Sequence, residues 1–187
     1  TFGGEGVVSG IYKKFSFSVG GTHFGTDGFR SNADQRDDIA NAFIQLELSP
    51  QTSLQAEYRY RHTETGDLAL RFFPENFSRS ERNKTESNTY RLGGRYAFAP
   101  SSIILGSFTY QDGHFSARDD QLPPPPSIRG ATGAFSAGQR HESEVGAEFQ
   151  HLFRSRYVNL TSGVGFFDIA GRIDQTGGIT FGPRSVV

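Results

Sequence analysis

The sequence predicts an all-β protein, an antiparallel transmembrane β-barrel, and three observations support this class. Apolar and charged residues alternate in runs of about ten residues, the strand length that a bilayer requires. The run Leu54-Gln55-Ala56-Glu57-Tyr58-Arg59-Tyr60-Arg61-His62 puts rings and aliphatic groups at every second position. Such runs are joined alternately by very short turns and by long polar loops. A period of two with one apolar and one charged face indicates a sheet between two different media.

Composition narrows the class further. The chain has 187 residues, enough for one β domain over 1–187 without a second domain, and its net charge of −1 predicts no nucleic-acid partner. A mean hydropathy of −0.49 and the lack of a long apolar run exclude a transmembrane helix but not a barrel. The sequence has no Cys and no Trp. Because it also has no initiator Met, we expect a processed chain or an excised segment. Tyr and Phe must then serve at the membrane interfaces, where Trp is common.

The alternation predicts about eight strands in four hairpins. They are expected at 5–12, 15–25, 38–48, 54–65, 86–98, 104–114, 139–153 and 158–170. Short turns are expected at Lys13-Lys14, 49–53, 99–103 and 154–157, and long connections at 26–37, 66–85, 115–138 and after Gly171. The segment Pro123-Pro124-Pro125-Pro126 is a stiff spacer that cannot join a sheet. The long connections are interpreted as solvated surface loops.

The apolar faces stay in register across each short turn. The expected pairs are Tyr12 with Phe15, Gly10 with Phe17, Phe98 with Ile104, Tyr96 with Gly106, Gly94 with Phe108, and Phe153 with Val158. This pairing shields strand glycines with rings of the neighbouring strand. A slip of one residue would exchange the two faces, so agreement over four hairpins favours the assignment.

The alternation assigns each strand residue to lipid or to the barrel interior. The residues expected to face lipid are Tyr58, Tyr60, Leu92, Tyr96, Phe108, Tyr110, Phe149, Leu160 and Val164. The residues expected to line the lumen are Glu47, Glu57, Arg59, Arg61, Arg91, Arg95, Glu142, Glu144 and Glu148. Arginine on the lipid face would cost about 2–4 kcal/mol at the bilayer midplane.

The inward charges allow two interpretations. Four arginines on neighbouring strands and three glutamates two strands further round would set up a transverse field across a lumen, which orients polar solutes and tunes ion selectivity. Alternatively, the charges neutralise one another in a narrow interior filled by its own side chains.

Other constellations carry little chemistry. His141 and Ser143 share a strand face as in outer-membrane phospholipases, but Asn159 has the opposite facing and lies near the other rim. The acidic pairs Asp37-Asp38 and Asp119-Asp120 are interpreted as solvated turn residues. The five histidines lack metal-ligand spacing. We therefore expect no catalytic site, no metal site and no cofactor.

Several stretches resemble one family. They are Gly21-Thr22-His23-Phe24-Gly25-Thr26-Asp27-Gly28-Phe29-Arg30, residues 53–77, residues 106–112 and residues 153–169. The chain is similar here to bacterial outer-membrane proteins in which periplasmic tetratricopeptide repeats precede a barrel like that of TonB-dependent receptors. The resemblance implies a barrel larger than eight strands, of which this chain is a sector. It transfers no functional residue.

The sequence thus predicts a β-barrel of a bacterial outer membrane, a porin-like pore or an export or uptake channel for a polar solute or polymer. The alternative is a non-conducting anchor for a periplasmic repeat domain or envelope assembly. The expected partners are outer-membrane lipid and further barrel strands or neighbouring subunits. Small inward residues such as Gly93, Ala97, Gly163 and Gly165 favour a wide, hydrated barrel, because an eight-stranded interior would have to be filled.

Overall fold

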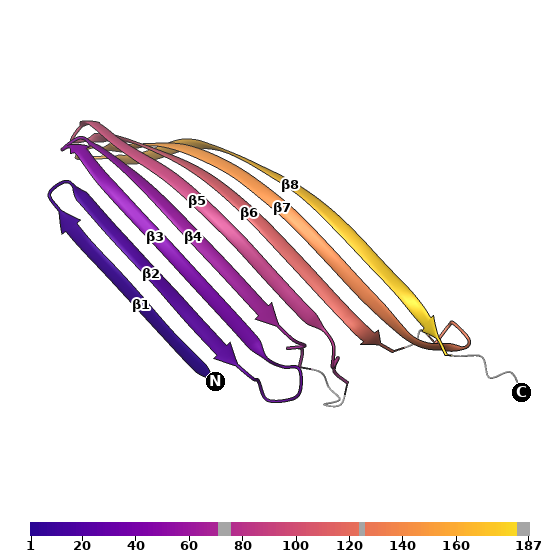
Figure 1. Ribbon diagram of the computed structural model, residues 1–187. Helices are drawn as coiled ribbons and strands as arrows, with labels where there is room; N and C mark the ends of the chain where they lie inside the picture. The colour runs from indigo at the N-terminus through magenta and orange to yellow at the C-terminus, as the bar shows by residue number, and fades with distance from the viewer. Residues whose placement is uncertain (71–75, 124–125, 183–187) are drawn as a thin grey trace, which may run out of the picture.

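The computed structural model describes residues 1–70, 76–123 and 126–182. They form one sheet of eight antiparallel strands in the order β1 to β8, joined in four hairpins by short turns at one end (Figure 1). The strands are β1 (Phe2–Tyr12), β2 (Phe15–Thr26), β3 (Gln35–Ser49), β4 (Thr52–Thr65), β5 (Arg82–Ala99), β6 (Ser102–Leu122), β7 (Ala131–Arg154) and β8 (Asn159–Phe181). The prediction of an all-β, antiparallel protein is confirmed.

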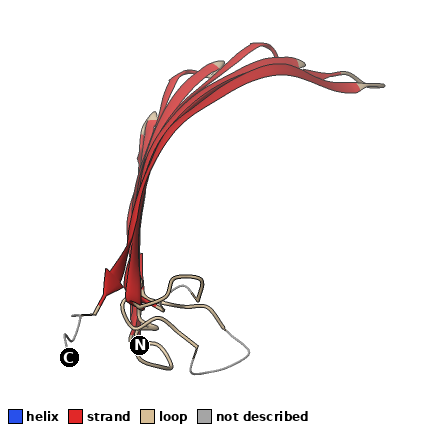
Figure 2. Ribbon diagram, turned by 90° about the vertical axis from the view of Figure 1, so that its right-hand side faces the viewer, coloured by secondary structure: helices blue, strands red, loops and turns tan. Residues whose placement is uncertain are grey.

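The sheet is open and strongly curved. Among the described residues, β1 and β8 each pair with one neighbour and not with each other, so no closed barrel is present. Figure 2 shows the strands bending to one side near the short turns, with the long loops at the opposite end. The described part of the chain holds no helix long and apolar enough to cross a membrane.

The predicted strands are present, but the last three extend beyond the predicted ends. β6 continues to Leu122, β7 begins at Ala131 and β8 continues to Phe181, so the loop predicted at 115–138 shrinks to residues 123–130. The extensions of β7 and β8, residues 131–138 and 171–181, are rich in Gly, Ala, Ser and Thr, and they lack the regular aromatic and charged alternation that marked the other strands. The middle of the proline run, residues 124–125, and the loop residues 71–75 lie outside the described residues.

Face assignments follow the predicted alternation, whereas two of the predicted registers are wrong by two residues. Tyr12 pairs with Phe15 and Gly10 with Phe17, as expected. Tyr96 instead pairs with Ile104, because Pro100 and Ser101 form the turn and the ladder shifts between Ala97 and Ala99.

The fourth hairpin shows the same offset. Phe153 pairs with Leu160 rather than Val158, because residues 155–158 form the turn. In that turn the Ser155 N–H donates to the Val158 carbonyl oxygen at 2.8 Å. A shift of two residues keeps every side chain on its predicted face.

The register shift removes one predicted role for aromatic rings. Gly94 pairs with Gly106, so neither glycine is covered in the way that Phe108 and Tyr96 were expected to cover them. Gly10 does lie under a ring, since a Cβ there would come within 2.9 Å of Phe17. Shielding of a strand glycine by a ring is therefore confirmed in the first hairpin and wrong in the third.

One face of the sheet, here called the apolar face, has an uncharged band next to the short turns. Between the row of Tyr58, Tyr90 and Tyr110 and the short turns, this face has no Asp, Glu, Lys or Arg in the described strands, and its one imidazole is His151 at the rim. Asp168 of β8 lies in line with the tyrosine row itself. Every residue predicted to face lipid lies on this face: Tyr58, Tyr60, Leu92, Tyr96, Phe108, Tyr110, Phe149, Leu160 and Val164.

Aromatic rings bound the band at both ends. At the loop end, Tyr58, Tyr90 and Tyr110 pair in one row across β4, β5 and β6, with ring centroids 5.1 and 6.3 Å apart. At the turn end, Tyr96 and Phe98 lie 6.3 Å apart and Phe98 stacks on His151. Beyond the tyrosine row this face becomes charged, with His62 against Glu86 and His141 against Asp112.

The sheet has no core of its own. In the described residues the buried hydrophobic side chains are only Ala33 and Ala97, while Val8, Leu92 and Val164 are 68%, 56% and 72% exposed. Full burial of such a side chain is worth about 1.5–3 kcal/mol. A single layer with this face uncovered is unstable in water, so the apolar face needs a cover.

The register of the third hairpin can be tested by cross-linking. With Leu92→Cys and Phe108→Cys on directly paired positions, we expect a disulfide on mild oxidation, because directly opposed strand residues lie within disulfide range. Peptide mass spectrometry measures it without background, since the chain has no native Cys. The matched control, Leu92→Cys with Tyr110→Cys, is diagonal and should stay reduced; efficient linkage there would contradict the register.

Candidate functional site

The second face, here called the polar face, contains every residue predicted to line a lumen. Strand pairing puts Glu57 beside Arg91 and Ser107 beside Glu148. The side chains that share the face by this alternation are Glu47, Glu57, Arg59, Arg61, Arg91, Arg95, Glu142, Glu144 and Glu148. Two hollows, each of about 390 Å³, lie on this face between β3 and β7.

Basic and acidic groups are separated across the polar face. Arg59 and Arg61 extend from β4, and Arg91 and Arg95 from the adjacent β5. The three glutamates of β7 lie two strands further along the sheet. The arrangement therefore has a basic centre and an acidic side, as the sequence predicted.

Ion pairs neutralise part of this charge. Glu57 accepts from the Arg91 guanidinium at 3.3 Å and lies 3.7 Å from that of Arg59. Arg61 donates to both carboxylate oxygens of Asp37, at 3.1 and 3.2 Å. Glu57 and Asp37 thus neutralise three of the four arginines, Arg59, Arg61 and Arg91.

The rest of the charge has no partner. Within the described residues, Glu47, Arg95, Glu144 and Glu148 make no ion pair and no side-chain hydrogen bond. These side chains are therefore available for contacts with groups outside the described residues.

The predicted lumen-lining set left out other charged residues of the polar face, among them Asp37 and Arg140. Asp37, interpreted as a solvated turn residue, lies in β3 and also accepts a hydrogen bond from the Thr63 hydroxyl at 2.6 Å. Arg140 of β7 lies 3.3 Å from Glu142. The alternation continues through both positions: Arg140 lies within the predicted strand 139–153, and Asp37 directly precedes the predicted strand 38–48.

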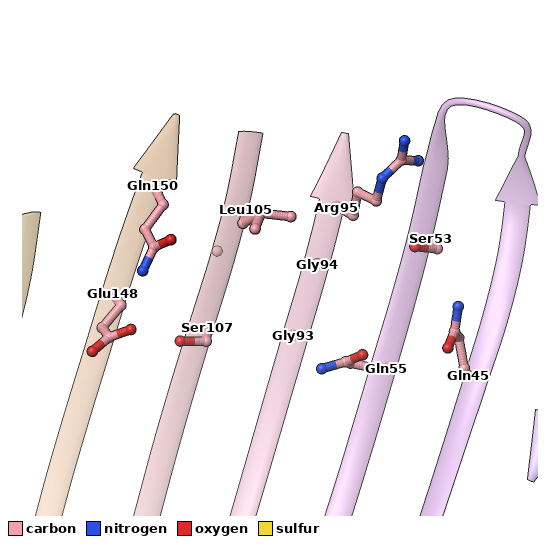
Figure 3. Close-up of a pocket in the computed structure, with 11 residues that line it drawn as sticks. Gln45, Ser53, Gln55, Gly93, Gly94, Arg95, Leu105, Ser107, Glu148 and Gln150 are labelled. Atoms are coloured by element: carbon pink, nitrogen blue, oxygen red, sulfur yellow. The ribbon is translucent and has the colours of Figure 1, made fainter. Parts of the chain in front are cut away.

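The hollow nearer the short turns has an unusual lining of amides and hydroxyls. It includes Gln45, Gln55 and Gln150 together with Ser53 and Ser107, as Figure 3 shows. Arg95 stands on β5, the middle one of the five strands, and Glu148 stands on β7 at one side. The second hollow follows toward the loops and is lined by Arg61, Glu142 and Glu144, among others.

The long loops are held together by the buried ion pair of Arg30 and Asp67 and by hydrogen bonds around it. Arg30, Asn32, Asp67 and Ser78 are here called the loop latch. Asp67 is 1% exposed, lies 3.4 Å from the Arg30 guanidinium and accepts the Ser78 N–H at 2.8 Å. Asn32 donates to the carbonyl oxygens of Ser78 and Glu81. Figure 2 shows these loops on the side toward which the sheet bends. The latch thus joins the loop between β2 and β3 to the loop between β4 and β5, at the end of the sheet opposite the short turns.

Other candidate residues are not brought together. His141 and Ser143 lie on the apolar face, and His141 contacts Asp112 at 3.2 Å, while Asn159 lies on the other face beside Arg154. The described residues contain no group of three or more His, Cys, Asp or Glu side chains placed to hold a metal ion.

Asp119 is the one predicted turn carboxylate that is buried. It lies beyond the apolar band, accepts a hydrogen bond from the Ser80 hydroxyl at 2.7 Å and takes another from the Gln121 N–H. Burial raises the pKa of Asp119, but the hydrogen bonds outweigh this and hold its pKa below the ordinary value. Asp119 therefore ties the loop before β5 to the end of β6.

Comparison with protein-family models and with curated protein sequences gave no match.

The loop latch can be tested by proteolysis. Asp67→Ala removes the acceptor of two backbone N–H groups and the partner of Arg30, at a local cost of about 3 kcal/mol. We expect trypsin to cut after Arg79 at least tenfold faster than in the native chain. Asp27→Asn is the control, because Asp27 is exposed and has no polar side-chain contact within the described residues. Equal rates in all three proteins would show that the latch does not hold the loop.

Proposed function

We propose that this sheet is part of the wall of a transmembrane β-barrel in a bacterial outer membrane, and that its polar face lines a water-filled pore for a polar solute. The observation that carries the proposal is the uncharged band bounded by aromatic rows on one face of a curved sheet. Barrels that cross outer membranes have an apolar belt flanked by aromatic girdles.

The dimensions of the band agree with a bilayer. On β5 it runs from Tyr90 to Ala99, ten residues, against the roughly 9–11 that a tilted strand needs to cross. The histidine–carboxylate pairs beyond the tyrosine row, such as His62 with Glu86, then lie at the level of the lipid headgroups. Charges there are hydrated and cost little.

Lipid also satisfies the requirement for a cover. The apolar side chains of the band are buried against acyl chains, and the charged polar face stays in water. The open edges β1 and β8 require partner strands, because unpaired backbone groups are not tolerated in hydrocarbon. Further strands of the same barrel or a neighbouring subunit supply them in this proposal.

A non-conducting anchor is the second candidate. The pairs Arg91 with Glu57 and Arg61 with Asp37 favour it, since they neutralise charge in the middle of the polar face. The free glutamates of β7 favour the pore, because unpaired wall charges act on passing ions.

Ion selectivity distinguishes the two candidates. The purified protein in planar lipid bilayers should conduct, and Glu144→Gln with Glu148→Gln should shift its reversal potential toward anions, because both carboxylates lack an ion partner in the described residues. Asp168→Asn on the apolar face is the matched control and should leave selectivity unchanged. A protein that inserts but never conducts supports the anchor; conductance insensitive to the glutamates refutes a pore along this face.

Orientation gives a separate prediction. Barrels insert with short turns in the periplasm and long loops outside. Cysteine at Asp27, an exposed loop position, should react with a membrane-impermeant maleimide on intact cells, while cysteine at Pro50 should react only after lysis. Labelling of Pro50→Cys but not of Asp27→Cys on intact cells would reverse the orientation.

A further inference from the structure

The hollow nearer the short turns is built from two cross-strand rows on the polar face. One row is Gln45, Gln55, Gly93, Ser107 and Glu148, each paired with the next across β3 to β7. The neighbouring row is Ser53, Arg95, Leu105 and Gln150. With strands about 4.8 Å apart, the first row spans about 19 Å. The rows thus form an elongated polar platform that crosses five strands (Figure 3).

The polar side chains of this platform are available to bind a ligand. Within the described residues, the three glutamines, the two serines, Arg95 and Glu148 make no side-chain hydrogen bond and no ion pair. The next residues toward the loops have partners within the sheet: Arg91 pairs with Glu57, and Thr89 donates to Gln111 at 3.1 Å. Free donors and acceptors are therefore concentrated in the hollow rather than spread over the face.

A glycine leaves the space between these groups. Gly93 sits in the first row between Gln55 and Ser107. A Cβ at Gly93 would lie 2.8 Å from the Gln55 side chain, so any larger residue would displace that carboxamide and fill the gap. The hollow measures about 390 Å³, within the range of about 300–1,000 Å³ of small-molecule sites.

The chemistry of the lining selects the ligand. Each carboxamide and hydroxyl both donates and accepts hydrogen bonds, and one cation is balanced by one anion. A ligand of either net charge would meet one like charge in the hollow, Arg95 or Glu148. A peptide would find few apolar contacts, because Leu105 is the one large apolar residue of the lining. Closely spaced hydroxyl groups, which also donate and accept, match this lining best.

We propose that this platform binds a neutral, hydroxyl-rich solute, a saccharide chain lying across β3 to β7. The proposal deepens the proposed function, because it names the class of solute that the polar face handles. Gln55 and Ser107 hydrogen-bond the sugar hydroxyls on either side of Gly93, and Arg95 from β5 and Glu148 from β7 orient the chain.

Binding is measured on the purified protein in detergent micelles by calorimetry and by saturation-transfer NMR of the ligand. The probes are the hexasaccharides of maltose, cellulose, mannan and chitin type, with hexaglutamate, hexalysine and hexaglycine as comparison ligands. We expect at least one hexasaccharide to bind and none of the three peptides. No binding of any saccharide, or binding of hexaglycine instead, overturns the proposal.

Variants locate the site. Gln55→Leu keeps the side-chain size and removes its hydrogen bonds, so saccharide affinity should fall about tenfold. Gln111→Leu is the matched control on the same face, outside this hollow, and should bind as the native protein does. Gly93→Ala provides a second variant that should also weaken binding, and far-ultraviolet circular dichroism checks that each variant folds. Equal affinity in Gln55→Leu, Gly93→Ala and the native protein refutes the site.

Conductance of the same preparation separates the two proposals. Saccharide binding without conductance in bilayers supports the platform and refutes the pore. Conductance without saccharide binding, and without block by any of the hexasaccharides, refutes the platform alone.

Discussion

The structure depends on one constraint: a single layer of strands cannot bury its own apolar face. In most β proteins a second sheet or a helix layer supplies the cover, and the core forms between them. Here the described residues contain no second layer, and large side chains such as Val8 and Val164 remain more than two-thirds exposed. Hydrogen bonds between strands cannot compensate, because each contributes only about 1 kcal/mol net. The environment of the apolar face, rather than any internal contact, therefore determines whether the fold is stable.

This constraint explains what could be predicted from the sequence. The face of each side chain follows from a period of two. Because a charge on the apolar face is costly, apolar and charged residues alternate clearly, as at Tyr58, Arg59 and Tyr60. The exact register follows from the turns, where an offset of two residues changes the pairing without changing the face. The pairing of Tyr96 with Ile104 rather than with Gly106 is such a case. Strand ends beyond the band were missed, because both faces there are polar and the alternation loses its contrast.

The candidate site was predictable to the same degree. The nine charged residues expected on one face share it, because facing is all that their assignment needed. Which charges pair could not be read from the sequence. Arg61 pairs with Asp37, which the sequence predicts in a turn, and the loop latch of Arg30 and Asp67 joins two loops that are separate in the chain. Such contacts depend on the path of irregular segments, for which alternation gives no information.

The two faces differ in the free-energy cost of a polar group that has no hydrogen-bond partner in the protein. On a water-filled side, Gln55, Ser107 and Glu148 remain hydrated, so leaving them without protein partners costs little until a ligand replaces the water. In the apolar band the same groups would lose their water without compensation. The polar face can thus hold a binding site without weakening the sheet, whose stability comes from the opposite face. A substitution such as Gln55→Leu is for that reason expected to change binding far more than it changes folding.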